Sequence, residues 1–198
     1  MSTAQKRHCT PKEYLEFERN SQFKHQYYKG EIFAMGGASF AHGQLVSNLT
    51  TLFGIHFKDS DCQAIPKDLR VKADKTGLYT YPDLTVVCGE PEFEDDVFDT
   101  LLNPKLMIEV LSDSTEAFDR GEKFAQYRTI DPFEQYALIS QREYRIEVFT
   151  RVGDGRWVLS EAAGVDSTIE FSTIQCSLKL RDVYERVTIP FQSEKPTK

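Results

Sequence analysis

Hydrophobic residues recur along this chain in two spacings, one typical of helices and the other typical of strands. After Ser39, a residue type that caps helices, the apolar positions 45, 49, 52 and 53 follow a three- and four-residue spacing. Thr10 is a residue type that caps helices and Pro11 is common in the first helical turn, and apolar residues follow at positions 14, 15 and 17. These patterns predict a short helix from residue 10 and a longer helix from residue 39.

Strands are predicted where apolar residues alternate with polar ones or form short continuous runs between turn residues. Two such regions have the pattern of hairpins: 25–35, with a turn at Lys29-Gly30, and 135–150, with a turn at 141–143. Further strands are expected at 81–87, 106–111, 157–159 and 168–171, with a meander across 62–77.

The remaining pattern completes a mixed α/β fold, in which helices flank a mixed sheet with additional β-hairpins. A third helix is predicted over 114–130, where Asp131-Pro132 stops it, and a short helix near 180–184 closes the fold. Residues 193–198 have the composition of a frayed tail. No linker, repeat or low-complexity block divides the 198 residues, so we expect one domain over 1–198 with an ordered core of about 10–190.

Composition limits the setting of the protein. The hydrophobic fraction of 40% is ordinary for a folded chain, and no window approaches the roughly 18 consecutive apolar residues of a membrane span. The N-terminus lacks the apolar core of a secretory signal, so we expect a cytoplasmic protein without a membrane segment. The four cysteines form no C-x-x-C pair, which argues against a zinc ribbon and predicts reduced, mostly buried thiols.

The net charge of the chain argues only weakly about nucleic-acid binding. A formal net charge of -7 argues mildly against a protein that coats nucleic acid, because such binding comes largely from Lys and Arg. It does not exclude an acidic nuclease, since carboxylates that hold a metal add to the negative sum. The acidic run 90–99 is expected to be a solvated, mobile loop with internal repulsion.

Two carboxylates occur in apolar surroundings. Asp83 follows Pro82 at the start of the run 81–87, and Glu109 lies inside the run 106–111. An acid at such a position costs several kcal/mol unless a positive charge compensates it, which indicates a cation site. With the two strands adjacent, both carboxylates and one backbone carbonyl, that of Val110, would share a hard divalent cation, Mg²⁺, with Mn²⁺ as a substitute.

Pro82-Asp83 followed by Glu109-Val110-Leu111 resembles the restriction-endonuclease-like PD-(D/E)xK superfamily, whose paired strands present an Asp, a Glu and a Lys around magnesium. One element departs from that pattern, because Leu111 stands where the lysine is expected and cannot stabilise charge on a phosphoryl group. The nearest replacement is Lys123, on the helix predicted after the Glu109 strand, from which a long side chain reaches back.

The motifs together resemble one family, the Uma-two endonucleases. They are Tyr28-Lys29-Gly30-Glu31-Ile32, Tyr81-Pro82-Asp83-Leu84, the run 108–115 and Asp119-Arg120-Gly121-Glu122-Lys123-Phe124. This resemblance covers about residues 14–151 and implies a restriction-endonuclease-like fold, a divalent metal, DNA as substrate and the displaced lysine on the helix. It supplies a class of chemistry rather than a recognised DNA sequence.

The roles follow from this resemblance and from the chemistry of the residues. Asp83, Glu109 and Lys123 form the expected catalytic core, with metal ligands from Asp83, Glu109 and the carbonyl of Val110. Glu31 is a fourth candidate, since its strand precedes the first long helix and brings another acid toward the metal. His42 is a candidate for phosphate contact or proton transfer near the start of that helix.

Other interpretations of these residues stay open. Asp83 is also explained as a turn residue after Pro82. Lys123 lies four residues after Asp119, which is the spacing of an ordinary ion pair on a helix. The leading function is Mg-dependent hydrolysis of DNA, with a homodimer expected by analogy with duplex cutters. The first alternative is a catalytically inactive nuclease-fold module for binding or assembly, and the second is a metal-dependent phosphoesterase acting on small substrates.

Overall fold

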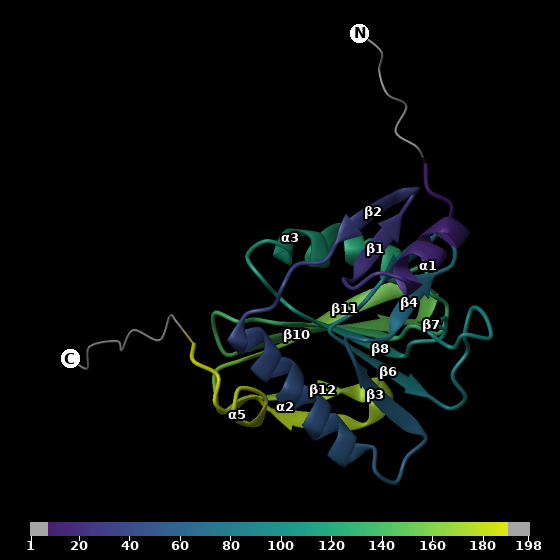
Figure 1. Cartoon of the computed structure of the whole chain (residues 1–198). Helices are drawn as coiled ribbons and strands as arrows, with labels where there is room; N and C mark the ends of the chain where they lie inside the picture. Colours follow the sequence, from purple (N-terminus) through teal and green to yellow (C-terminus); the bar gives the residue numbers. More distant parts are fainter. Residues whose placement is uncertain (1–7, 190–198) are drawn as a thin grey trace.

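The computed structural model describes residues 8–189, and its strands form three sheets (Figure 1). The tail predicted at 193–198 lies outside this range. The largest sheet has six strands in the order β11-β10-β9-β8-β6-β3. In chain order these strands are β3 (Cys62–Pro66), β6 (Leu84–Cys88), β8 (Leu106–Val110), β9 (Gln135–Ile139), β10 (Arg145–Val152) and β11 (Arg156–Ala163).

A five-stranded sheet and a two-stranded pair complete the β structure. The five strands lie in the order β2-β1-β5-β4-β7, and β12 pairs with β13. Their bounds are β1 (His25–Tyr28), β2 (Glu31–Ala34), β4 (Arg70–Ala73), β5 (Leu78–Thr80), β7 (Thr100–Leu101), β12 (Thr168–Phe171) and β13 (Cys176–Lys179). The β1–β2 and β9–β10 hairpins confirm the two predicted from the sequence.

Both predicted helix starts are confirmed. Helix α1 (Pro11–Arg19) begins with a capping box, in which Thr10 and Glu13 satisfy one another's backbone amides. Helix α2 (Phe40–His56) begins after Ser39, whose hydroxyl accepts a hydrogen bond of 3.1 Å from the His42 amide. The chain also forms the short helix α5 (Leu180–Val183) and the 3-10 turns η2 (Gly153–Gly155) and η3 (Ser172–Ile174).

The helix predicted over 114–130 is shorter and is interrupted. It consists of α3 (Glu116–Phe118), the π-helical turn η1 (Asp119–Lys123) and α4 (Phe124–Tyr127). This helical segment connects β8 to β9, which are parallel, and parallel neighbours require such a crossover. The sequence therefore predicted the segment correctly but not the π-turn within it.

The six-stranded sheet separates two hydrophobic cores. Leu106, Ile108 and Val110 of β8 belong to the core that includes Leu45 and Phe53 of α2. Met107 of the same strand and Leu111, which directly follows the strand, belong to a second core that includes residues of α4 and of the five-stranded sheet. Because successive side chains of a strand point to opposite faces, Glu109 faces the second core.

The predicted meander across 62–77 is wrong. Strand β3 joins the six-stranded sheet beside β6, whereas β4 lies in the five-stranded sheet between β5 and β7. Strand β4 also includes Lys72 and Ala73, which the sequence assigned to a turn. The sequence did not predict β13. Its four residues alternate between buried and exposed, and the strand is recognised only because it pairs with β12.

The charges of the acidic segment 90–99 are partly compensated, so the self-repulsion predicted for it is reduced, while its mobility stays a prediction. The Arg19 guanidinium lies 2.7 Å from Asp95 and 2.8 Å from Asp99. Lys72 lies 2.9 Å from Glu94. Cations from α1 and β4 thus compensate this segment, although they are distant in the sequence.

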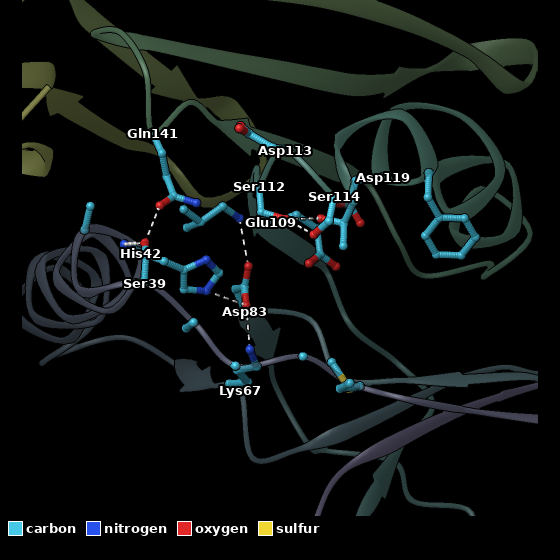
Figure 2. Close-up of a pocket in the computed structure, with 18 of the residues that line it drawn as sticks. Ser39, His42, Lys67, Asp83, Glu109, Ser112, Asp113, Ser114, Asp119 and Gln141 are labelled. Carbon is cyan, nitrogen blue, oxygen red and sulfur yellow. Dashed lines mark hydrogen bonds and ion pairs between the residues drawn. The ribbon is translucent and has the colours of Figure 1, made fainter. Parts of the chain in front are cut away.

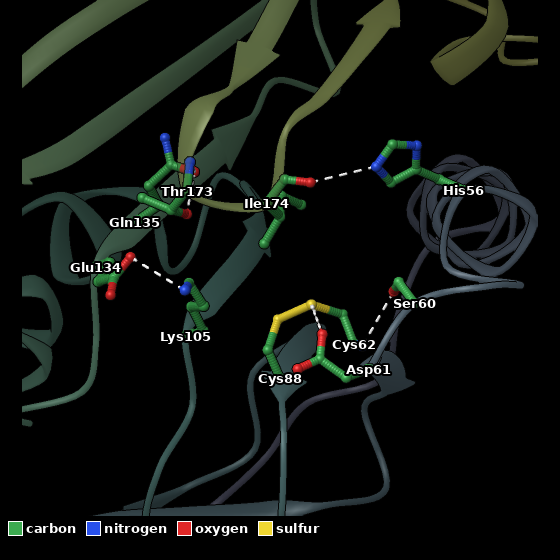
Figure 3. The surroundings of a disulfide bond; sticks show 10 residues. All are labelled: His56, Ser60, Asp61, Cys62, Cys88, Lys105, Glu134, Gln135, Thr173 and Ile174. Atoms are coloured by element: carbon green, nitrogen blue, oxygen red, sulfur yellow. Dashed lines mark hydrogen bonds and ion pairs between the residues drawn. A yellow bond between two sulfur atoms is a disulfide. The ribbon is translucent and has the colours of Figure 1, made fainter.

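The expectation of reduced thiols is wrong for two of the cysteines. The antiparallel register of β3 and β6 places Cys62 directly opposite Cys88, and the two form a disulfide (Figure 3). Cys176 is a buried free thiol, and Cys9 is half-buried. Separately, none of the helices between residues 8 and 189 combines the length and apolar composition that a membrane span requires.

Candidate active site

Asp83 and Glu109 meet where β6 and β8 pair. The antiparallel register joins Leu84 to Ile108, which places Asp83, one residue before Leu84, across from Glu109, one residue after Ile108. Both side chains are almost fully buried, with exposed fractions of 7% for Asp83 and 5% for Glu109. The adjacency of the two strands, on which the sequence-based site depended, is therefore confirmed.

Three groups contact the Asp83 carboxylate (Figure 2). His42 Nε2 lies 3.0 Å from Oδ1, the amide of Val110 donates to Oδ2 at 2.8 Å, and Lys67 Nζ lies 3.6 Å from Oδ1. Burial by itself favours the neutral acid, but the His42 contact and the Val110 amide hold the pKa of Asp83 below its ordinary value. Asp83 is thus kept as a carboxylate inside the protein.

Lys123 lies directly beside Glu109. Its Nζ is 2.7 Å from Glu109 Oε1 and 3.0 Å from Asp119 Oδ1, and the Tyr127 hydroxyl donates to the same Oε1 at 2.9 Å. Lys123 and Tyr127 thus both contact Oε1 of Glu109. Burial raises the pKa of Glu109, whereas the two carboxylates raise the pKa of Lys123 against the opposing effect of its own burial.

The π-turn η1 helps to position Lys123. A π-turn shifts the backbone hydrogen bonds of a helix, and here the Tyr136 hydroxyl from β9 donates to the Asp119 carbonyl at 3.1 Å. Asp119 and Lys123 are both buried in this turn. Leu111, at the position where the superfamily pattern has lysine, is buried in the second core, so the amine reaches Glu109 from the helix instead.

These groups lie in one cavity of about 920 Å³. Figure 2 shows Asp83 and Glu109 between Ser39 and His42 on one side and Ser114 and Asp119 on the other. The lining includes the predicted site residues Asp83, Glu109, Val110, Lys123 and His42. Glu31 is not among the lining residues, because it pairs with Tyr28 beside the hairpin turn.

Four further residues belong to this site and were not assigned to it from the sequence. Asp119 and Tyr127 lie four residues before and after Lys123, and this helical spacing was the available signal. Gln141 joins two walls of the cavity, accepting from the Ser39 hydroxyl at 2.7 Å and donating to the Leu111 carbonyl at 2.7 Å. Neither Gln141 nor Lys67 carries a sequence signal, since only the folded sheet brings them close.

The donor atoms fit a magnesium ion that keeps much of its water. The amide and carbonyl of a strand residue point to the same side, so the Val110 carbonyl faces the side of Asp83, to which its amide donates. Two carboxylates and a carbonyl are hard oxygen ligands. Among the described residues no group of three or more His, Cys, Asp or Glu side chains forms a complete cage, and Mg²⁺ does not need one.

Comparisons with known proteins identify the family of this chain. Residues 11–181 match the model of the Uma2 family, described as putative restriction endonuclease. The uncharacterized protein sll1609 of Synechocystis sp. is 39% identical over 163 residues, which are 82% of this chain and 92% of the relative. The uncharacterized protein slr1290 of the same organism is 35% identical over 175 residues, covering 88% of this chain and 90% of the relative.

A solved structure has the same fold. It is that of a putative nuclease belonging to DUF820 from Anabaena variabilis, with a TM-score of 0.71 and 16% sequence identity. The likeness covers 88% of this chain and 97% of the other. It confirms the nuclease-like mixed α/β fold expected from the sequence. The chain belongs to the Uma2 family.

Proposed function

We propose that this protein is an endonuclease that hydrolyses DNA phosphodiester bonds with the help of Mg²⁺ or Mn²⁺. One observation carries the proposal: Asp83, Glu109 and Lys123, from three separate segments of the chain, line the same cavity. Burying two carboxylates and a lysine carries a desolvation cost, and such perturbed groups in a cavity are typical of functional sites. The family description and the shared fold support the same class of reaction.

Each residue has a defined part in this proposal. Asp83, Glu109 and the Val110 carbonyl would hold a metal ion, which would supply a water of lowered pKa and stabilise charge on the phosphoryl group. Lys123, 2.7 Å from Glu109, donates hydrogen bonds toward the scissile phosphate or the attacking water. His42, 3.0 Å from Asp83, fixes the orientation of that carboxylate.

Nicking of supercoiled plasmid DNA in Mg²⁺ or Mn²⁺ tests the proposal. Asp83→Asn and Glu109→Gln are each expected to lower the rate at least about 100-fold, because each removes a charged metal ligand. Glu134→Gln is the matched control, since Glu134 is a carboxylate paired with Lys105 outside the cavity, 43% exposed. Its rate should equal that of the wild type.

Three outcomes would contradict the proposal. Failure of the wild type to cleave either plasmid or single-stranded DNA with either metal would favour the inactive nuclease-fold module. Release of phosphate from nucleotides without cleavage of DNA would favour a phosphoesterase. Equal rates in the wild type and in both carboxylate variants would assign any observed cleavage to a contaminating nuclease.

A further inference from the structure

The reactive groups of the candidate site are deeply placed, which restricts the form of DNA that reaches them. The exposed side-chain fractions are 7% for Asp83, 5% for Glu109 and 7% for Lys123. A phosphate oxygen must approach a magnesium ion to about 2.1 Å to bind it. The scissile phosphate therefore has to enter the cavity and cannot react at its rim.

The size of the cavity favours a narrow ligand. Its volume of about 920 Å³ lies near the upper end of the range of about 300–1,000 Å³ for pockets that enclose one compact ligand. Segments 35–38 and 112–115 both contribute to the lining, so backbone from two loops flanks the carboxylates. A duplex carries a second strand beside every phosphate, whereas a single strand brings one backbone into such a space.

The charges of the cavity point the same way. Arg142 lies beside Asp113 in an ion pair, and Lys123 is held between Glu109 and Asp119. Lys67 is more accessible, with 32% of its side chain exposed and its Nζ 3.6 Å from Asp83. Tight binding of duplex DNA comes largely from many contacts between phosphates and Lys or Arg, and the Lys and Arg residues of the lining are Lys67, Lys123 and Arg142.

We infer that the substrate is an unpaired DNA strand, which enters the cavity so that Lys67 contacts a phosphate next to the one held at Asp83 and Glu109. This inference rests on the proposed function and specifies its substrate. A single-stranded segment or a frayed end can bring one backbone into the cavity. Only one strand is then cut, so no second active site is needed.

The test uses one labelled oligonucleotide of about 30 nucleotides, which is longer than typical single-strand binding sites. The single-stranded oligonucleotide is compared with the duplex that it forms with its complement. Glu109→Gln is used for binding, measured by fluorescence anisotropy in Mg²⁺, and the wild type for cleavage. The single strand is expected to bind at least about ten-fold more tightly and to be cut at least about ten-fold faster. Equal or tighter binding of the duplex would overturn the inference.

The salt dependence of binding tests the contact with Lys67. In the Lys67→Gln variant the slope of log K against log salt is expected to fall by about 0.7, the value for one phosphate of a single strand. Lys105→Gln is the matched control, because Lys105 is 30% exposed and lies outside the cavity. An unchanged slope in Lys67→Gln would refute the contact.

Failure of the inference and failure of the proposed function give different results. If the protein binds the single strand tightly but cleaves no DNA, the proposed nuclease activity is refuted and the preference for single-stranded DNA is supported. Cleavage of the duplex as fast as the single strand would keep the nuclease and refute the preference.

Discussion

At the scale of single residues, the central feature is the compensation of charge around Lys123. Its amine is 2.7 Å from Glu109 and 3.0 Å from Asp119, and all three side chains are almost completely removed from solvent. Removing one partner of such a cluster leaves the others desolvated without compensation, which costs more than the cluster itself contributes. The site is therefore stable only as a complete set.

Lys123→Met tests this dependence through stability rather than activity. The methionine fills a similar volume but leaves two buried carboxylates unpaired, so the free energy of unfolding should fall by about 3 kcal/mol. Urea denaturation at neutral pH measures this change in the free energy of unfolding. The control Lys105→Met breaks only a surface ion pair and should change stability by less than about 1 kcal/mol. Equal losses in the two variants would refute the argument.

At the scale of elements, the π-turn between α3 and α4 is the feature that positions the site. Ordinary helical spacing predicts a continuous helix through 114–130, yet the structure has a π-turn over Asp119–Lys123. The Tyr136 hydroxyl, which reaches Asp119 from β9, contacts the backbone of this turn. Inserted side chains and π-turns are recognised causes of breaks in the regular helical ladder.

Tyr136→Phe removes only that hydroxyl and tests the role of the π-turn. We expect a stability loss of about 1 kcal/mol and, because Lys123 loses its fixed position, a DNA cleavage rate lowered roughly ten-fold. Tyr14→Phe is the control, since its buried hydroxyl also donates to a carbonyl, that of His25, at 2.6 Å. Tyr14 is outside the cavity lining, so this control should lose similar stability without loss of rate.

At the scale of the whole molecule, ion pairs join parts of the chain that are far apart in sequence. Arg19 of α1 lies 2.8 Å from Asp99, and the buried Arg70 of β4 lies 2.8 Å from the same carboxylate. The Arg19 guanidinium holds the pKa of Asp99 well below its usual range, and Arg70 adds to this effect. The first helix is thereby fixed to the segment that leads into β7.

This linkage predicts a pH-dependent contribution to stability. Because the folded-state pKa of Asp99 is lowered, its contribution is present above the ordinary aspartate pKa and is lost as pH falls below that value. Asp99→Asn should therefore be less stable than the wild type by about 1–2 kcal/mol at pH 7, and the difference should shrink toward pH 2. Urea unfolding at several pH values measures both. A pH-independent difference would contradict the linkage.

Local patterns determined several elements before any tertiary information entered. Thr10 and Ser39 start the helices that they predict, because a cap acts on amides only two or three residues away. The hairpin turn at Lys29-Gly30 and the apolar runs around Asp83 and Glu109 are likewise short-range signals. Two acids in apolar runs sufficed to predict a cation site. Magnesium dependence, the homodimer and the cytoplasmic location stay predictions.

Only the tertiary structure decided which distant groups meet. Whether Cys62 faces Cys88 depends on the register of β3 with β6, and a shift by one residue would turn every side chain to the other face. Lys67 and Gln141 reach the cavity because sheet pairing brings their segments together, and the acidic run 90–99 finds its cations in α1 and β4. The sequence by itself determined the two capped helices, the two hairpins and the positions of the two acids, since those signals act over a few residues. Their partners were decided by packing between segments tens of residues apart, which no local pattern encodes.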